Sequence, residues 1–123
     1  MKVLVYERES HEPGNKFHRF LEEHVPGETL KVCRSIEGLR EELMAPQEEE
    51  VVAVLLASTR EDLAALFSLR HRLQEIKTIL LAPDRMEETV ALAHRIRPRF
   101  LGWVHNDFSP ATAVLEKMLK NQG

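Results

Sequence analysis

The stretch Val51-Val52-Ala53-Val54-Leu55-Leu56-Ala57 is an unbroken apolar run of strand length, and it decides the fold. A second run of the same kind, Thr78-Ile79-Leu80-Leu81-Ala82, follows further along the chain. A strand that helices cover on both faces has this composition, because neither of its faces meets water. The two runs therefore predict the central strands of a parallel sheet with helices on each side.

Outward from these runs, strand-length segments alternate with segments of helical periodicity. The predicted strands are Lys2–Tyr6, Thr29–Arg34, Val51–Ala57, Thr78–Ala82 and Phe100–His105. Short connections between parallel strands require right-handed crossovers, which place helices on both faces of the sheet. We expect residues 1–123 to form one three-layer α/β domain, with a parallel five-stranded sheet in the flavodoxin-like order 2-1-3-4-5.

Capping residues mark where the predicted helices begin. Ser35 and Thr59 are candidate N-caps, Asp84 with Glu87 resembles a capping box, and Ser109 precedes a proline. The apolar residues at helical spacing are Phe17, Phe20, Leu21 and His24 in the first helix, Ile36, Leu39 and Leu43 in the second, Leu63, Leu66, Phe67 and Leu73 in the third, Met86, Val90, Ala93 and Ile96 in the fourth, and Val114, Leu115, Met118 and Leu119 in the fifth.

Composition narrows the class of protein. Hydrophobic residues make up 43% and charged residues 30% of the chain, a globular balance that argues against disorder. The net charge of −3 gives no electrostatic case for binding nucleic acid or an anionic membrane. Cys33 is the only cysteine, which excludes an intrachain disulfide. The apolar start at Met1–Tyr6 is too short for a signal peptide, and no run is long enough to cross a bilayer. We expect a cytoplasmic protein.

Three segments together suggest a family. They are Val3-Leu4-Val5-Tyr6-Glu7-Arg8-Glu9, Val54-Leu55-Leu56 and Gly102-Trp103-Val104-His105-Asn106-Asp107-Phe108. They resemble, in this order, the first strand and acidic loop, the run before the phosphorylated aspartate, and the fifth-strand ending of the receiver domains of two-component response regulators. The resemblance extends over nearly the whole chain and implies the receiver fold.

Receiver chemistry requires an aspartate acceptor, an acidic pair that holds Mg²⁺, a hydroxyl and a lysine, because phosphoryl transfer spreads negative charge over oxygens that must be neutralised. At the matching positions this chain has Glu7 and Arg8 for the acidic pair, Ala57 for the acceptor, Ala82 for the hydroxyl and Asn106 for the lysine. A shift of one residue offers only Ser58, whose unactivated hydroxyl is a poor substitute for a carboxylate. The resemblance therefore implies a degenerate phosphorylation pocket, with no catalytic residue, no metal and no cofactor, in a protein that is not an enzyme.

The first functional hypothesis is a receiver-like signalling module that binds a protein partner, or a second copy of itself, without being phosphorylated. Receivers pair through the fourth helix, fifth strand and fifth helix, so the resemblance implies that face for a partner or a homodimer. Arg95, Arg97 and Trp103 would contribute to it. Trp103 stands where the family has its switch aromatic, and we expect it to serve in packing or at an interface. The arginines also suit the negative end of a helix.

The alternative hypothesis is a ligand- or cofactor-binding domain. Open parallel sheets bind ligands at the carboxyl ends of their strands. Arg8, His11, Arg60, Arg85 and His105 are predicted to lie there, and they could hold an anion such as a nucleotide. The segment Glu9-Ser10-His11-Glu12-Pro13-Gly14 also resembles a weakened form of the cobalt-ligating loop of cobalamin-binding domains, although an exposed loop is the simpler interpretation.

Overall fold

The predicted sheet is present in the computed structural model, which describes residues 2–8, 19, 21–24, 30–105 and 108–120. The strands are β1 (Lys2–Tyr6), β2 (Leu30–Cys33), β3 (Val51–Leu56), β4 (Lys77–Ala82) and β5 (Phe100–Trp103). Every pairing is parallel and the order is β2-β1-β3-β4-β5, so β2 and β5 form the edges. The expected three-layer, flavodoxin-like α/β architecture is confirmed.

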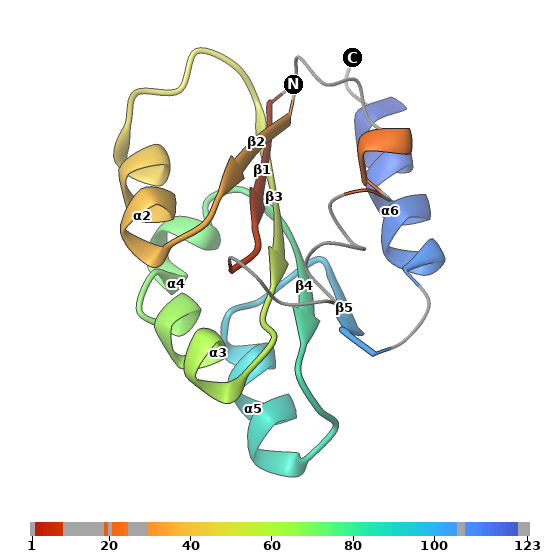
Figure 1. Cartoon of the computed structure of the whole chain (residues 1–123). Helices are drawn as coiled ribbons and strands as arrows, with labels where there is room; N and C mark the ends of the chain where they lie inside the picture. The colour runs from red at the N-terminus through yellow and green to blue at the C-terminus, as the bar shows by residue number, and fades with distance from the viewer. Residues whose placement is uncertain (1, 9–18, 20, 25–29, 106–107, 121–123) are drawn as a thin grey trace.

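Helices cover both faces of this sheet. They are α2 (Ile36–Met44), α3 (Arg60–Phe67), α4 (Arg70–Leu73), α5 (Glu87–Arg95) and α6 (Ser109–Lys120), and residues 21–24 are also helical. Figure 1 shows α2, α3, α4 and α5 on one side of the sheet and α6 on the other. Among the described residues, no helix is long and apolar enough to span a bilayer.

Alternation along the strands divides the apolar side chains between two cores, because successive strand residues point to opposite faces. On the α2–α5 side, the sheet contributes Leu4, Tyr6, Ala53, Leu55, Ala57 and Leu80. On the α6 side it contributes Val3, Val5, Val52, Val54, Leu56, Ile79 and Leu81, which pack with Leu21, Ala111 and Leu115. The two continuous runs are therefore buried on both faces, as their composition predicts.

Two of the predicted N-caps are present, at the starts of α2 and α3. The Ser35 hydroxyl accepts a hydrogen bond from the Gly38 N–H at 3.0 Å, and the Thr59 hydroxyl accepts one from the Asp62 N–H at 3.0 Å. Each bond satisfies a backbone donor that the first turn of a helix leaves without a partner. Thr59 thereby fixes the start of α3 directly after β3.

The third and fourth predicted helices differ from expectation. The third is broken at Ser68 and Leu69 into α3 and α4. The Ser68 hydroxyl donates to the Ala65 carbonyl, so a side chain satisfies an acceptor at the end of α3. The fourth begins after Met86 rather than at Asp84, whose carboxylate accepts the Met86 N–H at 2.9 Å inside the loop. Met86 and His24, expected on buried stripes, are exposed.

Candidate functional site

The carboxyl ends of the parallel strands form one edge of the sheet, which we call the carboxyl edge. Its described residues are Glu7, Arg8, Arg34, Ala57, Ser58, Thr59, Arg60, Ala82, Asp84, Arg85 and His105. Glu7, Arg8, Ala57 and Ala82, four residues of the degenerate pocket predicted from the receiver resemblance, lie at this edge. The pocket's fifth member, Asn106, and the loop with His11 lie outside the described residues.

The acceptor and hydroxyl positions of the predicted pocket are closed by the core. Ala57 and Ala82 are both fully buried, and the Ala57 N–H donates to the Leu81 carbonyl at 2.9 Å. Each of the two alanines presents a methyl group instead of an oxygen. The neighbouring Ser58 oxygen is buried without a hydrogen-bond partner among the described residues. Among the described residues, therefore, no base forms a hydrogen bond with the Ser58 hydroxyl that could activate it.

Glu7 follows β1 and is fully buried, with its Oε1 atom 3.2 Å from the Arg34 guanidinium. Burial raises the pKa of Glu7 from 4.5 to about 7, against the lowering influence of Arg34 and with a smaller raising influence from Glu22. The carboxyl therefore changes charge near neutral pH. Its ion pair with Arg34 joins the ends of β1 and β2.

Arg8 makes the second ion pair of the carboxyl edge. Its guanidinium lies 3.2 Å from Oδ1 of Asp62, which is only 2% exposed, and the Tyr6 hydroxyl donates to the same oxygen at 3.3 Å. Burial, followed by the charge of Asp62, raises the pKa of Tyr6 to about 12. Arg8 thus links the end of β1 to the first turn of α3.

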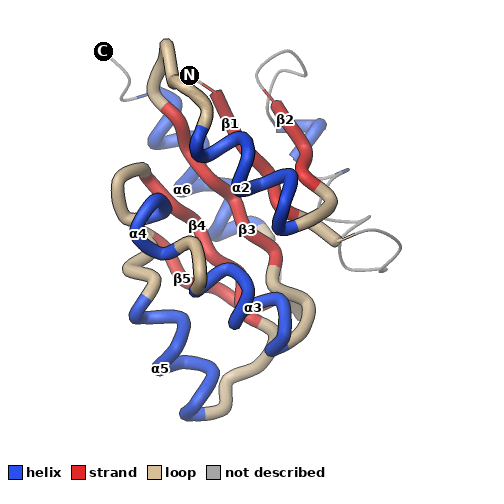
Figure 2. The backbone as a smooth tube through the Cα atoms, turned by 90° about the vertical axis from the view of Figure 1, so that its left-hand side faces the viewer, coloured by secondary structure: helices blue, strands red, loops and turns tan. Residues whose placement is uncertain are grey.

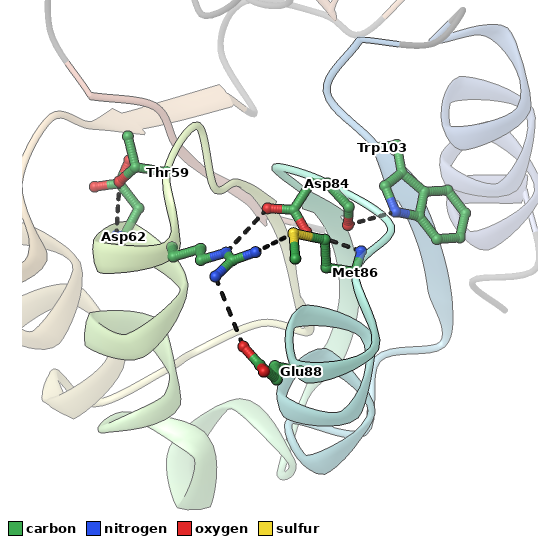
Figure 3. A network of polar contacts seen from close by, with 7 residues as sticks. Thr59, Asp62, Asp84, Met86, Glu88 and Trp103 are labelled. Atoms are coloured by element: carbon green, nitrogen blue, oxygen red, sulfur yellow. Dashed lines mark hydrogen bonds and ion pairs between the residues drawn. The ribbon is translucent and has the colours of Figure 1, made fainter.

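The third ion pair links α3 to the loop before α5 (Figure 3). Arg60 Nε lies 3.2 Å from Asp84, Arg60 Nη1 lies 3.7 Å from Glu88, and Nη2 contacts the Met86 sulfur. The nearby Thr89 side chain and the hydrogen bond from the Met86 N–H, with a smaller contribution from Arg60, hold the pKa of Asp84 below its usual range. The loop after β4 is therefore fixed against α3.

Trp103, at the end of β5, is fastened to the same loop. Its indole N–H donates to the Asp84 carbonyl at 2.9 Å, as Figure 3 shows, and the Arg85 guanidinium lies 3.8 Å from the centroid of the ring. A hydrogen bond and a cation–π contact on one ring restrict its rotamers. Trp103 is half-buried in this position.

The other two residues of the predicted partner surface lie in different surroundings. Arg95, in the last turn of α5, places its guanidinium 4.9 Å from the centroid of the Phe67 ring on α3. Arg97 lies between α5 and β5 and has a φ of 59°, in the left-handed region. It precedes β5 whereas Trp103 ends that strand, so the two lie at opposite ends of the edge strand.

The sequence predicts Arg8 and Arg60 at the carboxyl ends of the strands as cations that could hold an anion, but it does not reveal their carboxylate partners. Asp62 stands three residues after the Thr59 cap, and its contact with Tyr6 joins positions 56 apart in the chain. The spacing of Thr59 and Asp62 was the one local signal. It predicts a helix start but contains no information about the neighbouring strand.

In the part of the carboxyl edge that the structure describes, the main interactions of the charged side chains are ion pairs within the chain. No cluster of three or more metal-ligating side chains occurs among the residues that the structure describes. Comparisons of this chain with protein-family models, curated proteins and solved structures found no significant match. The fold and the contacts at the carboxyl edge are therefore the basis for the functional argument.

Proposed function

We propose that this protein is a receiver-like signalling and interaction module that binds a protein partner, or a second copy of itself, without being phosphorylated. The observation that carries the proposal is the state of the carboxyl edge. Ala57 is buried in the core where receivers have their acceptor, and Arg8 is paired with Asp62 where they have a metal ligand. The fold is kept while the oxygens required for phosphoryl transfer are replaced.

The positive charge of Arg8, as well as the lack of carboxylate oxygens, opposes phosphorylation at this edge. A magnesium ion at this edge would lie near Arg8, and the repulsion between a divalent cation and a guanidinium opposes its binding. Glu7 is fully buried, with Oε1 paired to Arg34, so its carboxylate would have to become exposed to ligate a metal. Neither of the two positions of the acidic pair therefore offers an available oxygen.

The face formed by α5, β5 and α6 is the surface that we propose for the partner. β5 is an edge strand of half-buried residues, and an unpaired strand edge is suited to association. At its end, Trp103 is held in one orientation by Asp84 and Arg85. A rigid, partly exposed tryptophan is a favourable interface anchor, because little side-chain entropy remains to be lost on binding.

The ligand-binding alternative has less support. Arg8, Arg34 and Arg60, three of the cations at the carboxyl edge, each contact a carboxylate of the same chain. An anionic ligand would have to compete with these ion pairs. A thermal-shift screen with nucleotides and cobalamin tests this alternative, and a concentration-dependent rise in the melting temperature would favour it over the interaction module.

Size-exclusion chromatography with light scattering, over a range of protein concentrations, tests self-pairing through this face. We expect a dimer that Trp103→Ala shifts toward monomer. Trp103→Phe keeps an aromatic ring and removes the indole N–H, so it should weaken the dimer less. Met44→Ser, on α2, is the matched surface control and should leave the dimer unchanged. A monomer at every concentration would contradict self-pairing and leave a different protein as the partner.

A further inference from the structure

A groove lies between α2 and α4, on the side of the sheet away from α6. Figure 2 shows the two helices next to each other in front of the sheet, and residues of α2 and α4 are in contact. The hollow between them has a volume of about 100 Å³, and its lining residues are Arg40, Leu43, Met44, Ser68, Leu69, His71 and Arg72. We call this the α2–α4 groove.

The floor of the first hollow is mainly apolar, and the groove extends beyond it into a hollow of mixed polar and apolar lining. A second hollow shares Leu43, Met44 and Arg72 with the first, and it continues along Ala45, Pro46, Gln47, Val51, Glu75 and Ile76. Leu43 and Leu69 are nearly buried beneath the surface, whereas Met44 is 59% exposed. Met44 and Met86 are the large apolar side chains that the structure leaves exposed among the described residues. The fold does not account for an exposed methionine beside an apolar hollow.

The rim of the first hollow is cationic. Arg40, His71 and Arg72 are its ionisable lining residues, although the whole chain has a net charge of −3. The third basic residue of the α4 segment, Arg70, is directed elsewhere, with its guanidinium 4.2 Å from the Phe67 ring centroid. Arg72 is half exposed and lies 4.0 Å from Glu75, a pair too open to solvent to neutralise it strongly.

We propose that the α2–α4 groove binds an acidic peptide segment of a partner protein, with an aliphatic side chain of the peptide seated beside Met44. An aliphatic anchor suits the floor made by Leu43, Met44 and Leu69, and acidic neighbours of that anchor suit Arg40 and Arg72. Methionine is well fitted to such a floor because its unbranched, polarisable side chain adapts to different partners. This surface is separate from the α5–β5–α6 face.

The test uses the whole chain and a fluorescein-labelled helical peptide with Leu at positions i, i+3, i+4 and i+7 and Glu or Ala elsewhere. Fluorescence anisotropy is expected to show binding that weakens as salt is added, because the charges at the rim are exposed. Met44→Glu should weaken binding at least about tenfold. Met86→Glu is the matched control, a similarly exposed methionine outside the groove, and it should leave the affinity within about twofold.

A second variant and a map of the contacts keep the test decisive if Met44→Glu fails to fold. Arg40→Glu combined with Arg72→Glu should also weaken the peptide at least about tenfold, since both charges at the rim are reversed. In an ¹⁵N-correlation spectrum, the peptide should shift the amides of residues 40–45 and 68–76. Trp103→Ala should leave peptide binding unchanged, which separates this inference from the proposed α5–β5–α6 interface.

Three results would overturn the inference. The first is failure of the wild-type chain to bind the Glu peptide. The second is equal binding of a matched peptide with Lys in place of each Glu, because the cationic rim should repel it. The third is an equal loss of affinity in Met44→Glu and Met86→Glu.

Discussion

Three arginines at the carboxyl edge each contact a carboxyl group of the same chain. Arg8 and Arg34 follow the ends of β1 and β2, and Arg60 begins α3. Two of these carboxylates, on Glu7 and Asp62, are buried. A buried charge is expensive unless it is paired, so removing either partner leaves a strong penalty behind. At the scale of single residues, the arginines at this edge are engaged by carboxyl groups of the same chain, and this leaves them less available to a phosphoryl group.

Glu7 should make stability depend on pH below neutrality. Its pKa is raised from 4.5 to about 7, so the folded protein binds more protons than the unfolded chain between these values. The protonated Glu7 side chain therefore makes its full contribution to the free energy of unfolding below pH 4.5. This contribution is lost as the pH rises to about 7. Glu7→Gln removes this titration. Its free energy of unfolding, relative to wild type, should therefore increase by on the order of 1 kcal/mol per pH unit across this range.

Urea unfolding of wild type and Glu7→Gln at pH values within and above this range measures the effect. As the pH rises, the free energy of unfolding of the wild type should decrease relative to that of the variant. A difference between the two proteins that stays constant with pH would show that burial does not shift the ionisation of Glu7.

Asp62 should contribute more to stability than its neighbour on the same helix turn. Asp62→Ala removes the acceptor for Tyr6 and the partner of Arg8 and should cost about 1–3 kcal/mol. Glu61 is acidic and lies in the same first turn but is exposed, so Glu61→Ala controls for the interaction with the helix dipole. Its cost should be less than about 1 kcal/mol. Equal losses in chemical denaturation would show that the buried contacts of Asp62 contribute nothing.

At the scale of elements, the end of α5 contains a residue in an unfavourable conformation. Arg97 follows the helix with a φ of 59°, a position that glycine usually occupies after a helix, and its N–H bonds the His94 carbonyl at 3.0 Å. A side chain in the left-handed region is strained because Cβ approaches the following carbonyl oxygen. The turn that leads into β5 is thus built at some cost in stability.

Arg97→Gly should relieve this strain and stabilise the protein by about 0.5–1 kcal/mol, the gain from the turn being partly offset by the freedom of glycine in the unfolded chain. Arg99→Gly, two residues later, is the matched control, because Arg99 does not have a positive φ. That change should give no gain. A lower free energy of unfolding for Arg97→Gly than for wild type, measured by urea unfolding, would contradict the inference that Arg97 is strained.

The sequence predicts elements well where burial and periodicity agree and less well where one side chain can form two kinds of contact. β3 and β4 are buried on both faces, so their apolar runs are unambiguous. Asp84 has the spacing of a capping box with Glu87, yet it bonds Met86 and Arg60 in the loop instead. The break at Leu69 is also invisible in the sequence, because no glycine or proline marks it and the leucines keep a helical period across it.

At the scale of the whole molecule, five alternating strand and helix segments with short right-handed crossovers leave few parallel sheet orders, and the flavodoxin-like order among them is the one observed. The positions of Glu7, Arg8, Ala57 and Ala82 at the carboxyl edge follow from that order. Their partners could not be predicted, since the pairs between Arg8 and Asp62 and between Trp103 and Asp84 depend on how α3 and the loop before α5 pack on the sheet. The sequence thus predicts which residues lie at the carboxyl edge, and the structure shows the contacts that they form.

The fold of a phosphoryl receiver without its chemistry is the central claim of this account, and phosphorylation in vitro tests it most directly. The purified chain is incubated with acetyl phosphate and Mg²⁺, beside a phosphorylatable receiver domain as the positive control, and both are measured by intact mass. We predict that the control gains one phosphoryl group and that this chain, with Ala57 and Arg8 at the receiver positions, keeps its mass unchanged. A stoichiometric gain of one phosphoryl group by this chain would contradict the account.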